Sequence, residues 1–243
     1  MINIVILAAG QGKRFTDFGY PIKPLIDVKG KPMLEKAVQS FVEGIEDPYR
    51  LLIIFRSTNL ENDKKIIDIC KRCNAIPIFL DRLTGGPAIT ALAAHNHINS
   101  NDSLIIANCD QIMNWNIQEF IDHANSLDKS YNGVVITFNG GEENKHSFIK
   151  YDENEKHYLT EKIKISDHAL AGIHFWHKGK DFVKSCIDMI VNNHVAPNGE
   201  FYISLSYNYL PPKVKVYPIN KTQFFPVGVP EELKSYLALK HEN

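Results

Sequence analysis

The sequence has few cysteines, no excess of charge of either sign and no long apolar run. Four cysteines scattered over 243 residues do not make the dense framework of a disulfide-stabilised secreted protein, so we expect reduced thiols. Lys and Arg number 27 against 28 Asp and Glu, which excludes a dedicated carrier of nucleic acid or another polyanion. Any charged ligand must therefore be bound by local clusters of side chains.

The sequence also lacks a membrane span, a targeting signal and a linker. The apolar run at residues 2–9 is too short to cross a bilayer and has no basic segment before it, so we expect a cytoplasmic protein without a membrane partner. No repeat and no tract rich in Gly, Ser or Pro divides the chain, and 44% hydrophobic residues suffice for a full core. The sequence therefore predicts a single domain over residues 1–243.

Strand-like and helix-like stretches alternate through the first half of the chain. Apolar runs predict buried strands, and apolar residues at helical spacing predict amphipathic helices. The expected strands are residues 2–7, 51–55, 76–80 and 103–109, and the expected helices are residues 33–45, 60–73, 88–98 and 117–126. This alternation indicates an α/β, Rossmann-like fold with a mainly parallel sheet and helices on both faces.

The second half has a different pattern. Short strand-like segments at 134–138, 147–152 and 157–163 are separated by polar turns, which predicts a small antiparallel insertion. A strand at 169–177, a helix at 181–192, a strand at 213–219 and a helix at 231–239 follow, and residues 198–210 are assigned to no type. The expected sheet is therefore mixed rather than wholly parallel.

A glycine-rich loop, AAGQGKR, follows the first predicted strand. Loops at the carboxyl ends of parallel strands form the ligand-binding edge of such sheets. Gly10 and Gly12 let backbone N–H groups approach an anion, Ala8 and Ala9 leave room for a flat base, and Arg14 offers a planar fork of donors to phosphate oxygens. The third glycine of a dinucleotide-binding loop and the Gly-Lys-Ser/Thr of a P-loop are both absent.

LAAGQGKRF, followed by YPIKPLIDVKGKPMLEKAV, resembles the signature of the sugar-phosphate nucleotidyltransferases, or NDP-sugar pyrophosphorylases. The resemblance implies that Arg14 and Lys23 hold the triphosphate of a bound NTP and act in catalysis. It also implies that the turn TGGPA closes on the nucleotide base, although a plain turn before a helix explains that segment as well. The implied nucleotide-binding residues are Leu7, Ala8, Ala9, Gly10, Gln11, Gly12, Lys13, Thr84, Gly85, Gly86 and Ala88.

Asp110 follows the buried run SLIIANC, so its carboxylate is expected at the ligand edge of the sheet. Mg²⁺ is commonly bound by one or two carboxylates plus substrate phosphates. ANCDQ is similar to the family's strand that ends in a metal-binding Asp, which implies a Mg²⁺ cofactor on Asp110. The family's second metal-binding Asp is replaced here by Leu205. Glu200 is the alternative second ligand. If Glu200 instead caps a helix, water or substrate phosphates would complete the coordination of the metal on Asp110.

HYLTEKIKISDHALAGIHFW is similar to the family's EKP element and the strand after it. The similarity implies that Glu161 and Lys162 face the acceptor, with Lys162 on its phosphate, and that Gly172 leaves backbone open beside the ligand. Ile163 replaces the usual Pro, and HSF at residues 146–148 replaces an element that contacts the sugar in hexose enzymes. The acceptor therefore need not be an ordinary hexose 1-phosphate.

The predicted reaction transfers a nucleoside monophosphate from an NTP to the phosphate of a small metabolite and releases pyrophosphate. The resemblance to small bacterial enzymes that supply capsule or lipopolysaccharide precursors favours CTP. The acceptor is a sugar phosphate, a polyol phosphate or another phosphorylated metabolite such as phosphoglutamine. Two alternatives are a nucleotide-sugar-dependent glycosyltransferase, whose Asp-x-Asp motif is absent, and a non-catalytic nucleotide-binding module. A homo-oligomer is compatible with the sequence.

Overall fold

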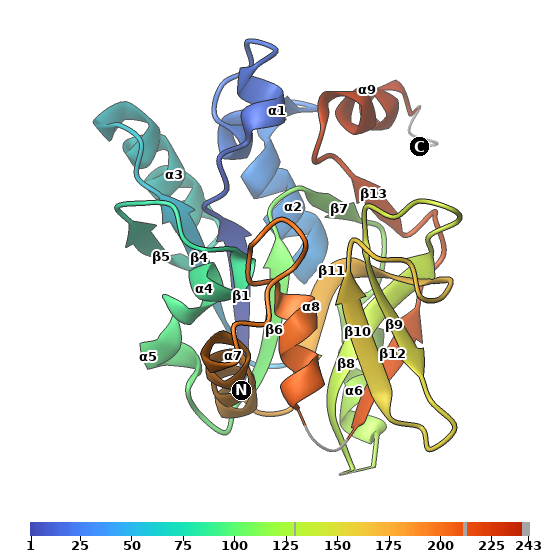
Figure 1. Cartoon of the computed structure of the whole chain (residues 1–243). Coiled ribbons are helices and arrows are strands. Elements are labelled where there is room, and N and C mark those ends of the chain that lie inside the picture. Colours follow the sequence, from blue (N-terminus) through green and yellow to red (C-terminus); the bar gives the residue numbers. More distant parts are fainter. Residues whose placement is uncertain (129, 211–212, 240–243) are drawn as a thin grey trace.

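The computed structural model describes residues 1–128, 130–210 and 213–239, and in them one large sheet carries helices on both faces (Figure 1). Its strands are β1 (Ile2–Ala8), β4 (Tyr49–Arg56), β5 (Ala75–Leu80), β6 (Ser103–Asn108), β8 (Tyr131–Asn139), β9 (Ser147–Tyr151), β10 (His157–Glu161), β11 (His168–Trp176) and β12 (Lys213–Pro218). The order is β10-β9-β11-β6-β1-β4-β5, with β8 between β11 and β12. The predicted α/β class with a mainly parallel sheet is confirmed.

The first-half strands form the parallel part of the sheet. β1 pairs in parallel with β4 and β6, and β4 pairs in parallel with β5. All seven residues of β1 are buried, because helices cover both faces of the strand and neither set of alternating side chains faces water. The carboxyl ends of β1 and β6 therefore meet at one edge, which is the upper edge in Figure 1, below α1 (Lys13–Thr16).

The second half adds an antiparallel part. β11 runs antiparallel to β6, β8 and β9, and β9 and β10 form a hairpin. β12 returns to pair with β8 in parallel, so the antiparallel strands are built into the large sheet rather than forming a separate unit. This arrangement brings β9, β10 and β11 to the same edge as β6.

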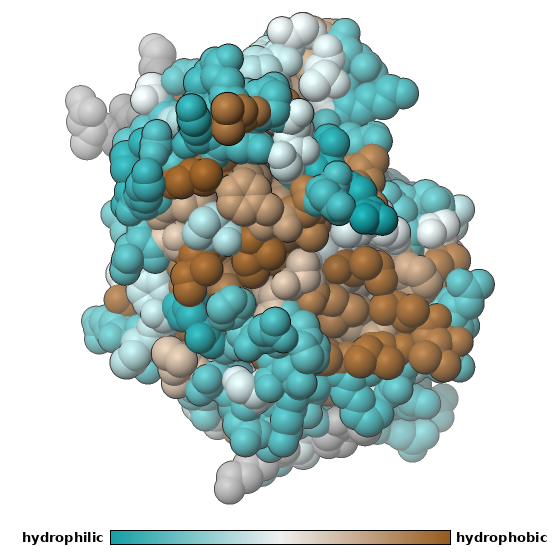
Figure 2. Space-filling view, turned by 90° about the vertical axis from the view of Figure 1, so that its left-hand side faces the viewer, coloured by the Kyte–Doolittle hydropathy of each residue, from teal (hydrophilic) through white to brown (hydrophobic). Residues whose placement is uncertain are grey.

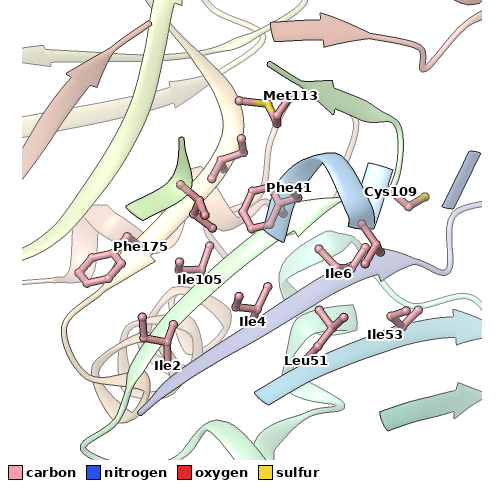
Figure 3. Close-up of a cluster of buried hydrophobic side chains, with 14 of the residues drawn as sticks. Ile2, Ile4, Ile6, Phe41, Leu51, Ile53, Ile105, Cys109, Met113 and Phe175 are labelled. Carbon is pink, nitrogen blue, oxygen red and sulfur yellow. The ribbon is translucent and has the colours of Figure 1, made fainter. Parts of the chain in front are cut away.

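Two apolar layers flank the sheet, because successive strand residues point to opposite faces. Ile2, Ile4 and Ile6 of β1 face α2 (Met33–Val42), α3 (Leu60–Arg72) and α6 (Ile117–Ser126), as Figure 3 shows for Phe41 of α2. The intervening residues, including Val5, face α4 (Pro87–Leu92), α5 (His95–Ile98), α7 (Gly179–Val191) and α8 (Ile203–Ser206).

Several element boundaries differ from those predicted. The helix expected at 88–98 is divided into α4 and α5, because the N–H groups of Ala93 and Ala94 bond to carbonyls three residues back, which interrupts the α-helical pattern. The helix expected at 33–45 ends at Val42, and Gly44 has a left-handed φ of 82°. Residues 198–210, assigned to no type, contain α8 and η2 (Tyr207–Tyr209).

Short elements that the sequence did not reveal complete the ligand edge. They are η1 (Lys23–Leu25), β2 (Asp27–Val28), β3 (Lys31–Pro32), β7 (Gln111–Met113) and β13 (Phe224–Pro226). β13 pairs with β7, and α9 (Pro230–Ala238) follows it. A third apolar cluster joins Phe15 of α1 to Ile112 of β7 and Leu233 of α9, so the C-terminal segment lies against the glycine loop.

The outer strand β5 carries exposed apolar side chains. Ile76 and Phe79 are 40% and 46% exposed, and Figure 2 shows apolar side chains gathered among hydrophilic ones on that side of the molecule. Pro77 lies within β5, where the missing N–H suits an unpaired edge. Among the described helices, none is both long and apolar enough to cross a membrane.

Candidate functional site

Two clefts meet at the carboxyl ends of β1 and β6. The larger, of about 1020 Å³, extends over β9, β10, β11 and the C-terminal segment, and the smaller, of about 500 Å³, lies between the glycine loop and the TGGPA turn. They adjoin, because seven residues line both. The shared residues are Gly10, Gly12, Lys23, Pro87, Asn108, Asp110 and Tyr202.

Most of the residues singled out from the sequence line these clefts. The small cleft is lined by Leu7, Ala8, Ala9, Gly10, Gln11, Gly12, Thr84, Gly86 and Glu200, and also by Lys23 and Asp110. The large cleft is lined by Lys13, Arg14, Glu161, Lys162 and Gly172, again with Lys23 and Asp110. Gly85 and Ala88 line neither cleft, and Ala88 is fully buried.

The glycine loop has its shape because Gly12 adopts a left-handed conformation, with a φ of 62°. A Cβ atom at Gly12 would lie 2.9 Å from the Cβ of Lys23, so a side chain there would displace that lysine. Phe15 anchors the loop in the third apolar cluster and is completely buried. The neighbouring Lys13 and Arg14 remain exposed, with their side chains at the cleft.

Lys23 and Asp110 form an ion pair at the wall common to both clefts, with the Nζ of Lys23 bonded to the Oδ2 of Asp110. Their side chains are only 19% and 20% exposed. Burial is the largest single influence on Lys23 and would lower its pKa, but the charge and hydrogen bond of Asp110, together with Cys109 and Glu232, raise the pKa overall. The lysine is therefore a permanent cation at the centre of the site.

Asp110 is held by the C-terminal segment as well as by β6. Its carbonyl oxygen accepts a 2.9 Å hydrogen bond from the N–H of Val227. A Cβ atom on Gly228 would lie 2.7 Å from the Asp110 Oδ2, so a side chain there would displace that carboxylate. The N–H of Gly228 donates to the Oε2 of Glu232 at 3.1 Å, which fixes the segment from the side of α9.

The residues around Asp110 suit a metal shared with substrate phosphates better than a metal held by protein alone. Within residues 1–128, 130–210 and 213–239, no group of three or more His, Cys, Asp and Glu could hold an ion. Glu200 lines the small cleft with Asp110, but its Oε2 accepts from the Asn198 amide at 2.6 Å and from the Tyr202 hydroxyl at 2.9 Å. Mg²⁺ bound mainly through phosphates needs only one or two carboxylates, and Asp110 meets that requirement.

The TGGPA turn is clamped to the segment that carries Glu200. The N–H of Phe201 donates to the carbonyl of Gly85 at 2.9 Å, and the N–H of Ala88 donates to the carbonyl of Phe201 at 3.0 Å. Gly86, with a φ of 132°, passes so close that a Cβ there would lie 2.6 Å from the backbone N and O of Phe201. Gly85 and Ala88 thus do not line the small cleft themselves, but their backbone groups hold the segment at Phe201 in place beside it.

Lys162 has an unusual backbone conformation for a residue with a side chain, a left-handed φ of 58°. Its N–H donates to the carbonyl of His146 at 2.9 Å. Its Nζ donates to the Tyr202 hydroxyl at 2.9 Å and lies 5.0 Å from the centre of that ring. Because Tyr202 in turn donates to Glu200, one hydroxyl joins the cation of the large cleft to the carboxylate of the small one.

Glu161 precedes Lys162 and points to different partners. Its side chain is buried, with 5% of the residue exposed, and the hydroxyls of Ser147 and Ser204 both donate to its Oε2. Burial raises the pKa of Glu161, and the two serine hydrogen bonds oppose that rise by stabilising the charged form.

Gly172 leaves space for two amides at the floor of the large cleft. Its φ is 73°, and a Cβ there would lie 2.7 Å from both the Nδ2 of Asn108 and the Nε2 of Gln111. Two residues further along β11, His174 is buried, and its Nδ1 has no partner among the described residues. Burial lowers the pKa of His174 to about 3, so its ring is neutral.

Sequence reasoning missed several cleft residues. Asn108 and Gln111 flank the predicted Asp110 at the end of β6, so their position in the sequence could have found them. Ser147 lies in the HSF segment that the sequence analysis compared with a sugar-contacting element. Tyr202 and Ser204 had no such signal, because only the packing of α8 and the residue before it brings them to the cleft. The large cleft is also lined by Phe138, whose ring lies 5.1 Å from that of His146 and 5.4 Å from that of Phe224.

Comparison with known proteins places this chain in a family. Residues 4–185 match the family model described as MobA-like NTP transferase domain. The chain is 30% identical over 131 residues to the bifunctional protein GlmU of Methanococcus vannielii, a match that covers 52% of this chain and 28% of that protein. The chain thus spans less than a third of that relative's length.

Solved structures share the fold. A nucleoside-diphosphate-sugar pyrophosphorylase from Vibrio cholerae superposes with a TM-score of 0.78 at 21% identity, covering 98% of this chain and 100% of that one. A UDP-glucose pyrophosphorylase complexed with UDP-glucose superposes with a TM-score of 0.71 at 14% identity, covering 98% and 97%. At these identities the likeness is one of architecture.

Proposed function

Because this chain belongs to the MobA-like NTP transferase domain family, we propose that it is a nucleotidyltransferase. It transfers a nucleoside monophosphate from an NTP to the phosphate of a small metabolite and releases pyrophosphate. The observation that carries this proposal is the meeting of Lys23, Asp110 and the glycine loop at the wall shared by two adjoining clefts. One cleft serves each substrate, and the shared wall is where the reacting phosphates would meet.

Charge neutralisation is the main task of such a site. A triphosphate and a phosphomonoester together bring roughly six negative charges, and each pair about 4 Å apart repels by about 4 kcal/mol at an effective dielectric of 20. Lys13, Arg14, Lys23 and Lys162 line the large cleft and supply positive charge along it. We assign Arg14 and Lys23 to the triphosphate and Lys162 to the acceptor phosphate.

No general base is needed, because a phosphate monoester has a second pKa of about 6 and is already ionised at neutral pH. Mg²⁺, held by Asp110 and phosphate oxygens with Glu200 as the second candidate ligand, would offset charge on the phosphates when bound. The chain's own contribution is to orient the two phosphates in line and to hold cations beside the leaving pyrophosphate.

The nucleotide base would lie in the small cleft, between Ala8 and Ala9 on one side and Thr84 and Gly86 on the other. We propose CTP as the NTP, on the resemblance to small bacterial enzymes that make capsule or lipopolysaccharide precursors. The solved UDP-glucose pyrophosphorylase complex supports nucleotide binding by this fold. The acceptor is a sugar phosphate, a polyol phosphate or another phosphorylated metabolite such as phosphoglutamine.

Pyrophosphate release tests the proposal. The purified chain is incubated with Mg²⁺, each of CTP, UTP, GTP and dTTP, and a panel of phosphorylated metabolites. We expect release that requires both an NTP and an acceptor. NTP binding without release would indicate a non-catalytic nucleotide-binding module, and sugar transfer from a nucleotide sugar would indicate a glycosyltransferase. Either result would overturn the proposal.

A further inference from the structure

We propose that Ser147 and Ser204 are positioning residues, which hold Glu161 so that its second carboxylate oxygen receives a hydrogen-bond donor of the acceptor. The proposal rests on the proposed nucleotidyl transfer. The resemblance already implies that Glu161 faces the acceptor; the new part is the pair of hydroxyls that orients its carboxylate.

Three separate elements meet at this carboxylate. Glu161 ends β10, and Ser147 begins β9 directly opposite it in the antiparallel register. Ser204 comes from α8 and is only 2% exposed, with its Oγ 3.0 Å from the Oε2 of Glu161. All three side chains belong to residues that line the large cleft. A carboxylate held from two sides in this way has one orientation.

Both serine hydroxyls donate to the same oxygen. The Oε2 of Glu161 accepts from Ser147 and Ser204, whereas its Oε1 has no donor in the described residues. Glu161 lines the large cleft, so a ligand in that cleft can reach the side chain that carries this oxygen. An oxygen that no protein group pairs can exchange water for a ligand O–H or N–H, and the charge of the carboxylate strengthens that hydrogen bond.

The backbone separates this oxygen from the phosphate position. Because Lys162 adopts the left-handed conformation, the adjacent side chains reach different partners, Glu161 the two serines and Lys162 the hydroxyl of Tyr202. The acceptor would then be held at two points, its phosphate at Lys162 and a donor group at Glu161. Two fixed points select both the length and the orientation of the acceptor.

A purely structural role is the competing interpretation, since the two hydrogen bonds also join the hairpin to α8. Steady-state kinetics of Ser147→Ala and Ser204→Ala separates the two. We expect the acceptor KM to rise by about tenfold, the worth of a hydrogen bond to a charged group, while kcat and the KM for the NTP change little. Ser206→Ala is the matched control, because Ser206 is buried in the same helix and donates only to the carbonyl of Ile203.

A double-mutant cycle makes the test specific to the carboxylate. In a Glu161→Ala background, Ser147→Ala and Ser204→Ala should leave the acceptor KM unchanged, because nothing remains to be positioned. Effects that are additive with Glu161→Ala, or that change both KM values by the same factor, would overturn the proposal.

A readout independent of activity distinguishes failure of this inference from failure of the proposed function. The carboxyl carbon of Glu161 is titrated by ¹³C NMR in the wild type and the serine variants. Loss of either hydroxyl removes a bond to the charged form, so the pKa of Glu161 should rise. If the pKa of Glu161 is unchanged in both serine variants, the positioning role is overturned, whether or not the enzyme is active. If the wild type is inactive with all acceptors, the transfer reaction is refuted instead.

Discussion

Lys23 and Asp110 are 87 residues apart in sequence and form one ion pair at the wall shared by the two clefts. Before any substrate binds, the cation proposed for the triphosphate and the carboxylate proposed for the metal therefore neutralise each other. Both groups must exchange this partner when phosphates and metal arrive. The pair keeps a buried charge satisfied in the free protein and makes substrate binding an exchange of partners.

Lys23→Met should strengthen metal binding in the absence of nucleotide. The lysine ammonium occupies the Oδ2 of Asp110 and repels a divalent ion, so its removal frees the carboxylate. We expect the affinity for Mn²⁺ alone to rise by about tenfold or more, given about 4 kcal/mol between unit charges 4 Å apart at a dielectric of 20. Electron paramagnetic resonance of free Mn²⁺ measures it. Adding Asp110→Asn should abolish the gain, and equal affinity in Lys23→Met and the wild type would contradict the expectation.

Arg14→Ala should lower turnover by about a hundredfold, comparable with the loss of one preorganised donor to developing charge. Arg14 is exposed at the cleft wall, so the free energy of unfolding should stay within about 0.5 kcal/mol of the wild type. Pyrophosphate release at saturating substrates measures the effect. Arg82→Ala, which removes an exposed arginine paired with Asp81 outside both clefts, is the control and should retain full turnover. Unchanged turnover in Arg14→Ala would exclude the proposed role.

Gly86→Ala should destabilise the fold by about 3 kcal/mol, through backbone strain together with a collision against buried backbone. The new Cβ would lie 2.6 Å from the backbone N and O of Phe201. Gly199→Ala is the matched control, because Gly199 also has a positive φ, 79°, but its Cβ would meet nothing within 4 Å. It should lose only about 1 kcal/mol from strain. Urea unfolding measures both, and equal losses would show that the contact with Phe201 is unimportant.

His174→Phe should flatten the acid limb of the stability curve. The pKa of His174 is about 3 in the folded protein because of burial, against 6.5 for an exposed histidine. As the pH falls below 6.5, His174 therefore binds a proton in the unfolded chain but stays neutral in the native state, which favours unfolding. The stabilisation from the neutral ring is present above pH 6.5 and is lost toward pH 3 at up to about 1.4 kcal/mol per pH unit.

Phenylalanine keeps an aromatic ring near Trp176 and Tyr207, whose rings lie 6.0 and 5.7 Å from that of His174. Urea midpoints between pH 7 and pH 4 should fall less steeply in His174→Phe than in the wild type. His168→Phe replaces an exposed histidine of the same strand and should keep the wild-type slope. Parallel curves for His174→Phe and the wild type would mean that the ring does not resist protonation in the fold.

Sequence patterns predicted the parallel half of the fold because each strand and helix there is defined within about ten neighbouring residues. The fully buried β1 is an uninterrupted apolar run, and α6 was predicted with the bounds Ile117–Ser126 that the structure gives. Patterns failed where distant contacts decide the outcome. α4 ends early, at Ala93 and Ala94. Periodicity is read within a short window of neighbouring residues, so it gives no sign that β12 will pair with β8 in parallel.

The sequence by itself determined which groups could serve the chemistry: a loop with Gly10 and Gly12, cations at Arg14 and Lys23, and an acid at the end of a buried strand. These are local features, set by backbone freedom, apolar periodicity and side-chain charge. Only the tertiary structure decided which of them touch. The order of strands brings Asp110 to Lys23, and the hairpin register brings Ser147 to Glu161. Contacts between segments far apart in the chain depend on how the sheet is assembled, and no local pattern contains that information.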